Sequence, residues 1–268
     1  MGGDAVGGSA LRIMSFNLQV DWEGAPHPWS ARREAVIALL RHERPHLLGT
    51  QEGLYSQVGE AQEGLGPEYA RIGEGREGGE RGEHMAVLYD RNRLESLEHG
   101  HFWLSDTPHV PGSETWGGGC PRMVTWVRFR DLVTGGELFA ANTHFDHESA
   151  YARARSAALL AERLDALASG VPRLITGDFN TPAGDPEVHA VLSAQAGLED
   201  TWDNAERRGP SYGTFHGYGP LRPDGARIDW ILASRGTRVH GTSVGLPAPD
   251  AVWPSDHLPV RAVVELSC

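Results

Sequence analysis

Short apolar runs that end in polar residues recur along the chain, a pattern typical of buried β-strands. The first run covers Leu11–Asn17, and a second short run covers residues 46–50. Between them, apolar residues at helical spacing include Val36, Leu39 and Leu40. The opening is therefore predicted to be β-α-β, with Ser30 as the cap at the start of the helix.

The rest of the chain mixes both kinds of element. Helical spacing recurs at residues 57–65, 149–168 and 186–192. Strands are expected at 85–89, 94–104, 123–129, 137–142, 172–176, 226–233, 238–244 and 258–266. Hairpins together with helical crossovers favour two packed mixed β-sheets flanked by helices, a four-layer αββα sandwich of the α/β (α+β) class, although spacing alone does not fix the topology.

Composition bounds the organisation of the chain. Its 268 residues are 40% hydrophobic and 22% charged, which suits one globular domain, expected at residues 11–268. Residues 1–10 are Gly-rich and are expected to form a disordered lead-in. They resemble neither a signal peptide nor a membrane anchor, so the chain as given is expected to be cytoplasmic, and to be exported only if a signal had been removed. The protein is also expected to be a monomer. A bridge between Cys120 and Cys268 stays open.

The charge balance restricts the partners. The formal net charge is −12, and the chain contains no Lys, so all 24 basic residues are Arg. Such a surface repels long polyanions, although a local basic groove could overcome the overall balance. Long nucleic acid is therefore disfavoured, and no transmembrane segment is expected.

The segment Gly177-Asp178-Phe179-Asn180 carries the first chemical signal. It follows the apolar run 172–176, so Asp178 and Asn180 would lie at the tip of a strand, where α/β proteins tend to place ligands. Asp178 and Asn180 are two residues apart, and on extended backbone such side chains point to the same side, so both could face one ligand. The competing interpretation is an ordinary turn.

Five further strand ends carry residues of the same kind. Their segments end in Asn17, in Gln51-Glu52 and in Asn142-Thr143-His144, or contain Arg227-Ile228-Asp229 and Ser255-Asp256-His257. Each has a structural explanation as a turn, cap or satisfied histidine, but together they indicate one convergent site. Asp229 lies between apolar residues, and a buried carboxylate needs a partner, for which a histidine is the natural candidate.

In this order, the six motifs resemble those of the endonuclease/exonuclease/phosphatase superfamily, and the resemblance extends from Leu11 to Leu266. Segments 100–108 and 121–126 are similar to small bacterial members with deadenylase-like motifs. The resemblance implies the αββα sandwich, with the site at one sheet edge.

The resemblance also implies roles. Glu52 would bind Mg²⁺ or Mn²⁺, with Asn17 and Asp256 as direct or water-mediated partners. Asp178 would orient or deprotonate the attacking water, while Asn180 and His144 would bind the phosphoryl oxygens. His257, held by Asp229, would contact the phosphate or transfer a proton. Alternatively, Asp178, Asn180 and His257 could hold a second ion.

Three weaker candidates lie outside these motifs. Arg122 follows a Gly-rich loop and could anchor a phosphate, although a surface Arg paired with an acid is an equal alternative. His216 lies in a Gly- and aromatic-rich loop that could close over the substrate. His147 is an alternative to His144.

The sequence thus predicts a hydrolase, a metal-dependent phosphoesterase acting on a phosphomonoester or phosphodiester, with a small or lipid-like substrate favoured. The alternative is a nuclease acting on short DNA or RNA at the same site. Aromatic residues at Trp103, Trp116, Tyr212, Phe215 and Tyr218 could stack a base. A binding module without chemistry and a membrane-active phospholipase are less favoured, because the polar set is intact and no segment is dedicated to insertion.

Overall fold

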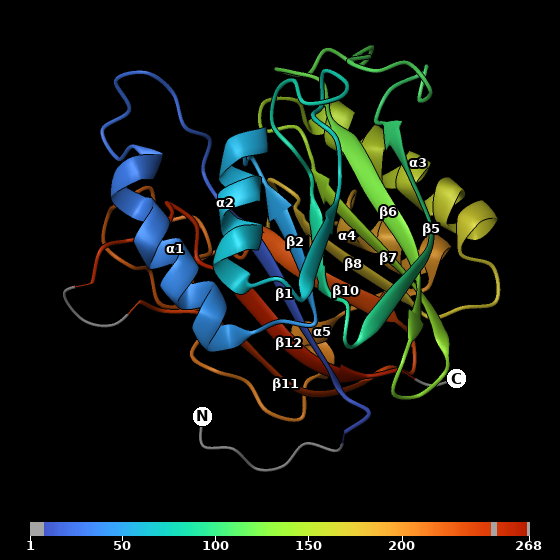
Figure 1. Cartoon of the computed structure of the whole chain (residues 1–268). Helices are drawn as coiled ribbons and strands as arrows, with labels where there is room; N and C mark the ends of the chain where they lie inside the picture. Colours follow the sequence, from blue (N-terminus) through green and yellow to red (C-terminus); the bar gives the residue numbers. More distant parts are fainter. Residues whose placement is uncertain (1–7, 248–250, 267–268) are drawn as a thin grey trace.

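Two β-sheets lie face to face at the centre of the molecule, with helices on their outer sides (Figure 1). This computed structural model describes residues 8–247 and 251–266, so Cys268 and residues 1–7 of the lead-in expected at residues 1–10 lie outside the described residues. The helices are α1 (Trp29–Glu43), α2 (Tyr55–Leu65), α3 (Ala150–Leu167), α4 (His189–Ala196) and α5 (Thr201–Asn204). None of the helices in the described ranges is long and apolar enough to cross a membrane.

Each sheet has six strands. The first consists of β1 (Leu11–Asn17), β2 (Leu47–Gln51), β3 (Tyr69–Ile72), β4 (Val87–Asp90), β11 (Arg238–Val244) and β12 (Val260–Glu265), in the order β11-β12-β1-β2-β4-β3. The second consists of β5 (Leu94–Trp103), β6 (Met123–Asp131), β7 (Glu137–His144), β8 (Arg173–Asp178), β9 (Leu198–Asp200) and β10 (Asp229–Ser234), in the order β5-β6-β7-β8-β10-β9. Both sheets mix parallel and antiparallel pairs, which confirms the predicted αββα sandwich.

The core has three layers, because each strand sends alternate side chains to opposite faces. Leu11 and Ile13 of β1 pack between the sheets, whereas Met14 and Phe16 pack with α1 and α2. On the second sheet, α3 and α4 cover a cluster in which Trp230 stacks on Phe179 with ring centroids 4.2 Å apart. The same alternation directs polar residues near the strand ends into the space between the sheets.

The sheets approach closely beneath those polar strand ends. A Cβ atom added at Gly49 would lie 2.0 Å from Thr176 Oγ1 and 2.5 Å from Asn142 Oδ1, so only glycine fits there. Next to it, Gln51 Nε2 donates a hydrogen bond of 2.7 Å to Asn142 Oδ1 and joins the two sheets. The floor of the site is therefore tied across both sheets.

Some local expectations differ from the structure. Helix α1 begins at Trp29 after Pro28 without a side-chain cap, so Ser30 lies inside the helix and does not cap it. The expected strand at 226–233 begins only at Asp229, because the amide of Ile228 donates to Thr214 Oγ1 and its carbonyl accepts from the amide of Phe179. Strands β3 and β9 and helix α5 were not predicted, since each has at most four residues.

The buried His46 predicts a pH-dependent stability. Its Nδ1 accepts a hydrogen bond of 3.1 Å from the backbone N–H of Arg12, and burial, assisted by the charge of Arg12, lowers the pKa of His46 to about 4. The unfolded chain, with an ordinary histidine pKa, therefore binds the proton more tightly, and stability is lost as the pH falls from about 6.5 to about 4. We expect His46 alone to contribute a loss of about 3 kcal/mol, measured by urea unfolding at several pH values. His46→Asn keeps an acceptor without titrating, so an unchanged pH dependence in this variant would contradict the assignment.

Candidate active site

Three neighbouring strands of the second sheet place charged or polar side chains side by side. His144 ends β7 and pairs in register with Asp178 at the end of β8, which in turn pairs with Asp229 at the start of β10. All three are buried between the sheets. The predicted convergence of His144, Asp178 and Asp229 thus follows directly from strand register.

The first sheet supplies the opposite wall. Asn17 ends β1, and its Nδ2 donates 2.8 Å to Glu52 Oε1 and 3.1 Å to Asp178 Oδ2. The Oδ1 atom of Asn17 accepts from the amide of Gln19, which fixes the orientation of the side-chain amide. The second oxygen of Glu52 accepts from the amide of Val20 at 2.9 Å. Asn17 therefore links acids that come from different sheets.

His257 is held by Asp229, as the sequence predicted for the buried acid. Its Nδ1 lies 3.0 Å from Asp229 Oδ2, and its Nε2 lies 3.7 Å from Asp178 Oδ2. Burial disfavours a charged ring, but the carboxylates of Asp229 and Asp178 outweigh it and raise the pKa of His257 to about 10. The ring is thus a protonated donor that presents Nε2 to the centre of the site.

His144 has the opposite character. Burial, assisted by the charge of Arg122, holds the pKa of His144 well below its ordinary value. Asn180 Nδ2 lies 2.9 Å from Nε2 of this neutral ring, and the same amide nitrogen donates to the carbonyl of Phe145 at 3.0 Å. Two histidines with opposite protonation states therefore flank Asp178.

Asp178 lies in the middle of the cluster and is 1% exposed. Burial, together with the negative charge of Asp229, raises the pKa of Asp178 to about 7. Its Oδ1 accepts from the amide of Asn180 at 2.9 Å, which fixes the carboxyl plane. A carboxyl group with a pKa near neutrality is suited to accept a proton from water.

Two residues of the site have backbone in the left-handed region. Asn180 has φ 51°, which asparagine tolerates well, but Glu52 has φ 63°, which is uncommon for a long side chain. Such strain persists only where the surroundings enforce it, and it is common at functional sites. The conformation directs the Glu52 carboxylate toward Asn17.

The donor set fits a divalent cation. Ligand atoms of Glu52, Asp178 and His257 all lie within 4.8 Å of one another, but a protonated His257 has no lone pair to offer, so the ligands in this group are the two carboxylates. Burial raises the pKa of Asp178 to about 7 and also raises the pKa of Asp256, so acids near Glu52 carry an electrostatic cost that a cation would relieve. The side-chain nitrogen of Asn17, and not its oxygen, faces Glu52. Asn17 Oδ1 could therefore bind a metal ion next to Glu52 only after the side-chain amide rotates by about 180°.

Asp256, predicted as a metal ligand, lies beside this group but outside it. Its Oδ1 accepts from Ser255 Oγ at 3.2 Å, and Ser255 Oγ also donates 2.7 Å to the carbonyl of Asn17. The structure thus joins the segment 255–257 to the end of β1. In this arrangement Asp256 is a further acid beside the cluster of Glu52, Asp178 and His257.

The two predicted substrate-binding residues lie at different sides of the site. Arg122 directly precedes β6, next to His144 on β7, and its Nη2 is 3.0 Å from Nδ1 of His147. His216 packs on Trp253 with ring centroids 4.3 Å apart, and burial lowers the pKa of His216 to about 4. The amide of His216 donates to the carbonyl of Asp256, so its loop borders the cluster near His257.

Sequence reasoning did not identify Arg32, a buried arginine that holds the loops of the site. Arg32 is 1% exposed, and its guanidinium donates to the carbonyls of His27, Leu18, Gln19 and Pro254 at 2.7–3.0 Å. It thereby joins the segment after β1 to the segment before Ser255. Its helical position among polar residues gave no signal, because its partners are backbone groups distant in sequence.

Replacing Arg32 by Lys is expected to destabilise the fold by about 2–3 kcal/mol, because an ammonium cannot satisfy four carbonyls in the geometry of a guanidinium. Urea unfolding would measure the change. Arg33→Lys is the matched control: Arg33 is exposed and pairs with Glu34 and Glu60, so an unchanged urea midpoint is expected. Equal effects of the two substitutions would contradict the role of Arg32.

The αββα sandwich, with acids, amides and histidines gathered at one sheet edge, is the arrangement that the resemblance to the endonuclease/exonuclease/phosphatase superfamily implies. The model of the Endonuclease/Exonuclease/phosphatase family matches residues 14–257. The chain therefore belongs to this family, whose members hydrolyse phosphoester bonds and generally depend on divalent metals.

Solved structures agree with this membership. An endonuclease/exonuclease/phosphatase from Bacteroides vulgatus is 30% identical, with TM-score 0.90, over 96% of this chain and 99% of that chain. A mannosyl-6-phosphatase from Bacteroides thetaiotaomicron is 32% identical, with TM-score 0.88, over 96% of this chain and 100% of that chain. The human Nocturnin catalytic domain, at 16% identity and TM-score 0.73 over 97% of this chain and 95% of that chain, shares the fold. No curated protein matches the chain.

Proposed function

We propose that this protein is a divalent-metal-dependent phosphomonoesterase that acts on a small phosphorylated substrate, such as a sugar phosphate. The observation that carries the proposal is the position of Asp178, a carboxyl group with a pKa raised to about 7, between His144, His257 and Asn17. The similarity to a mannosyl-6-phosphatase over nearly the whole chain supports the substrate class. The net charge of −12 also favours a small substrate over a long polyanion.

Each residue of the site has a separate role in hydrolysis. Asp178 orients the attacking water and accepts its proton. Asn180 and neutral His144 bind phosphoryl oxygens, and protonated His257, oriented by Asp229, donates through Nε2 to a phosphoryl oxygen as negative charge develops there. Glu52, with Asn17 and the nearby Asp256, would hold Mg²⁺ or Mn²⁺, which supplies neutralisation of the phosphoryl charge when it is bound.

A nuclease acting on a short oligonucleotide is the second candidate, because one exposed aromatic side chain near the site offers a face on which a base can stack. Phe215 is 53% exposed, although its ring centroid lies only 5.0 Å from that of His257. Trp103 and Trp116, which the sequence also suggested for base stacking, are buried and do not offer an open face. A single exposed ring beside His257 could support either a base or a sugar face.

A substrate panel separates the two candidates. Phosphomonoesters including mannose 6-phosphate, simple phosphodiesters, and short DNA and RNA are tested with Mg²⁺, with Mn²⁺ and with chelator. We expect hydrolysis of phosphomonoesters that chelation abolishes and that Phe215→Ala reduces mainly through KM. Preferential cleavage of oligonucleotides would establish the second candidate, and full activity in the presence of chelator would overturn the metal-dependent mechanism.

A further inference from the structure

Two arginines from different loops converge beside the catalytic edge, on the side away from His257. Arg122 precedes β6, whose neighbour β7 ends in His144, while Arg76 belongs to the loop between β3 and β4. Arg122 is 5% exposed, and its Nε and Nη1 atoms have no hydrogen-bond partner among the described residues. The buried Nε atom of Arg76 likewise has none within the described ranges.

The other guanidinium nitrogens of the two arginines make contacts that locate the unpaired N–H groups. Arg122 Nη2 donates to His147 Nδ1 at 3.0 Å, and Arg122 Nε lies 3.9 Å from Asp146 Oδ2, too far for a hydrogen bond. Arg76 Nη1 contacts Glu83 Oε2 at 2.7 Å and Cys120 Sγ at 3.2 Å. Arg122 therefore contacts His147 and Arg76 contacts Cys120, two side chains whose ligand atoms lie within 4.8 Å of each other.

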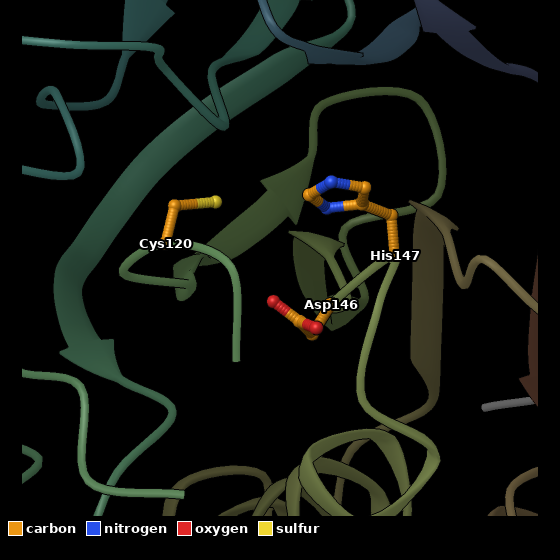
Figure 2. A group of neighbouring side chains, drawn as sticks. All are labelled: Cys120, Asp146 and His147. Atoms are coloured by element: carbon orange, nitrogen blue, oxygen red, sulfur yellow. The ribbon is translucent and has the colours of Figure 1, made fainter. Parts of the chain in front are cut away.

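That region also contains Cys120, Asp146 and His147, whose ligand atoms lie within 4.8 Å of one another (Figure 2). A metal ion is nevertheless disfavoured there. His147 Nδ1 is occupied by the N–H of Arg122, Cys120 Sγ is contacted by Arg76, and both guanidinium groups repel a cation. The Asp146 carboxylate is already engaged by the amides of Gly119, Glu148 and Ser149.

A buried guanidinium N–H without an acceptor is costly, whereas a bidentate oxyanion satisfies it with short charge-assisted bonds. We propose that Arg122 and Arg76 form a subsite for a second anionic group of the substrate, a carboxylate or a further phosphate, next to the phosphoryl-binding residues. The inference rests on the proposed function of the catalytic site and narrows its substrate to phosphomonoesters that carry another anion. The phosphoryl group itself is already served by His144, Asn180 and His257.

Matched substrates test the subsite. The matched pairs are glycerol 3-phosphate with 3-phosphoglycerate, erythritol 4-phosphate with 4-phosphoerythronate, and sorbitol 6-phosphate with 6-phosphogluconate. In each pair a carboxylate replaces the terminal hydroxymethyl group. In at least one pair, we expect the carboxylate to raise kcat/KM about tenfold, as one charge-assisted bidentate contact would. Arg76→Gln should lower kcat/KM for the carboxylate member about tenfold more than for the polyol phosphate, whereas Arg81→Gln, which changes an exposed arginine of the same loop, should keep the preference.

Binding measured in the absence of hydrolysis tests the anion subsite independently of the phosphomonoesterase activity. Calorimetry in chelator, with the same three pairs, should show the carboxylate member binding about tenfold more tightly to the wild type and to Arg81→Gln, but not to Arg76→Gln. Equal affinities in every pair, or an equal loss for both members in Arg76→Gln, would overturn the subsite. Absence of hydrolysis together with the selective binding would overturn the phosphomonoesterase function and leave the subsite standing.

Discussion

Replacing Asp178 by Asn is expected to lower kcat by about a thousandfold, the typical contribution of a positioned general base. Asn keeps the size of the side chain, and it can still accept from the amide of Asn180 through its oxygen. It cannot accept a proton from water, and it removes a carboxylate that helps keep His257 protonated. The measurement is the steady-state rate with the best phosphomonoester of the panel at saturating Mg²⁺.

The control separates chemistry from folding. Asp224→Asn changes an exposed acid with φ 54°, a conformation that asparagine adopts readily, so its rate should match that of the wild type. Asp178→Asn relieves the repulsion with Asp229 but removes an acceptor of Asn17 Nδ2, so urea unfolding is measured to show that the variant is folded under the assay conditions. A rate within tenfold of the wild type in a folded Asp178→Asn protein would remove Asp178 from the role of base.

The convergence of the strand ends was predictable from sequence because it depends on local patterns. Alternation along β7, β8 and β10 places His144, Asp178 and Asp229 on the face that Leu138, Leu174 and Ile231 share with the opposite sheet. The polar residue at the end of each apolar run then has to lie at the edge of the core. The cost of burying a carboxylate predicted a histidine partner for Asp229, and the family resemblance implied that this partner is His257.

Contacts made through loops were not predictable in the same way. Arg32 binds four backbone carbonyls up to 222 residues away, and no sequence pattern encodes such partners. Glu52 has left-handed backbone, and its carboxylate accepts from the amide of Val20, which is 32 residues away in the sequence. The guanidinium atoms of Arg76 and Arg122 without a hydrogen-bond partner result from the packing of the loops before β4 and before β6. Loop packing could not be predicted, because loops have no periodic sequence pattern.

The buried links between the sheets connect this fold to its chemistry. Asn17 and Glu52 come from the first sheet and Asp178 from the second, so any movement of one sheet against the other would separate them. The Gln51–Asn142 hydrogen bond and the close approach at Gly49 fix that relation one residue layer below the site. Rigid positioning of this kind keeps a charged cluster assembled despite its electrostatic cost.

Glu52→Gln is expected to weaken the binding of Mg²⁺ by about a hundredfold and to lower kcat by a similar factor at saturating metal, because a neutral amide replaces the carboxylate that would bind the ion. The substitution keeps the size of the side chain, but its single amide oxygen can accept from the amide of Val20 or from Asn17 Nδ2, and not from both. Titration of the rate with Mg²⁺ and calorimetry of Mg²⁺ binding would measure the two effects separately. Glu63→Gln, on the exposed side of α2, is the matched control and should leave both unchanged. A Glu52→Gln enzyme with wild-type Mg²⁺ affinity would show that other acids hold the metal, and the proposed division of labour between Glu52 and Asp178 would then be wrong.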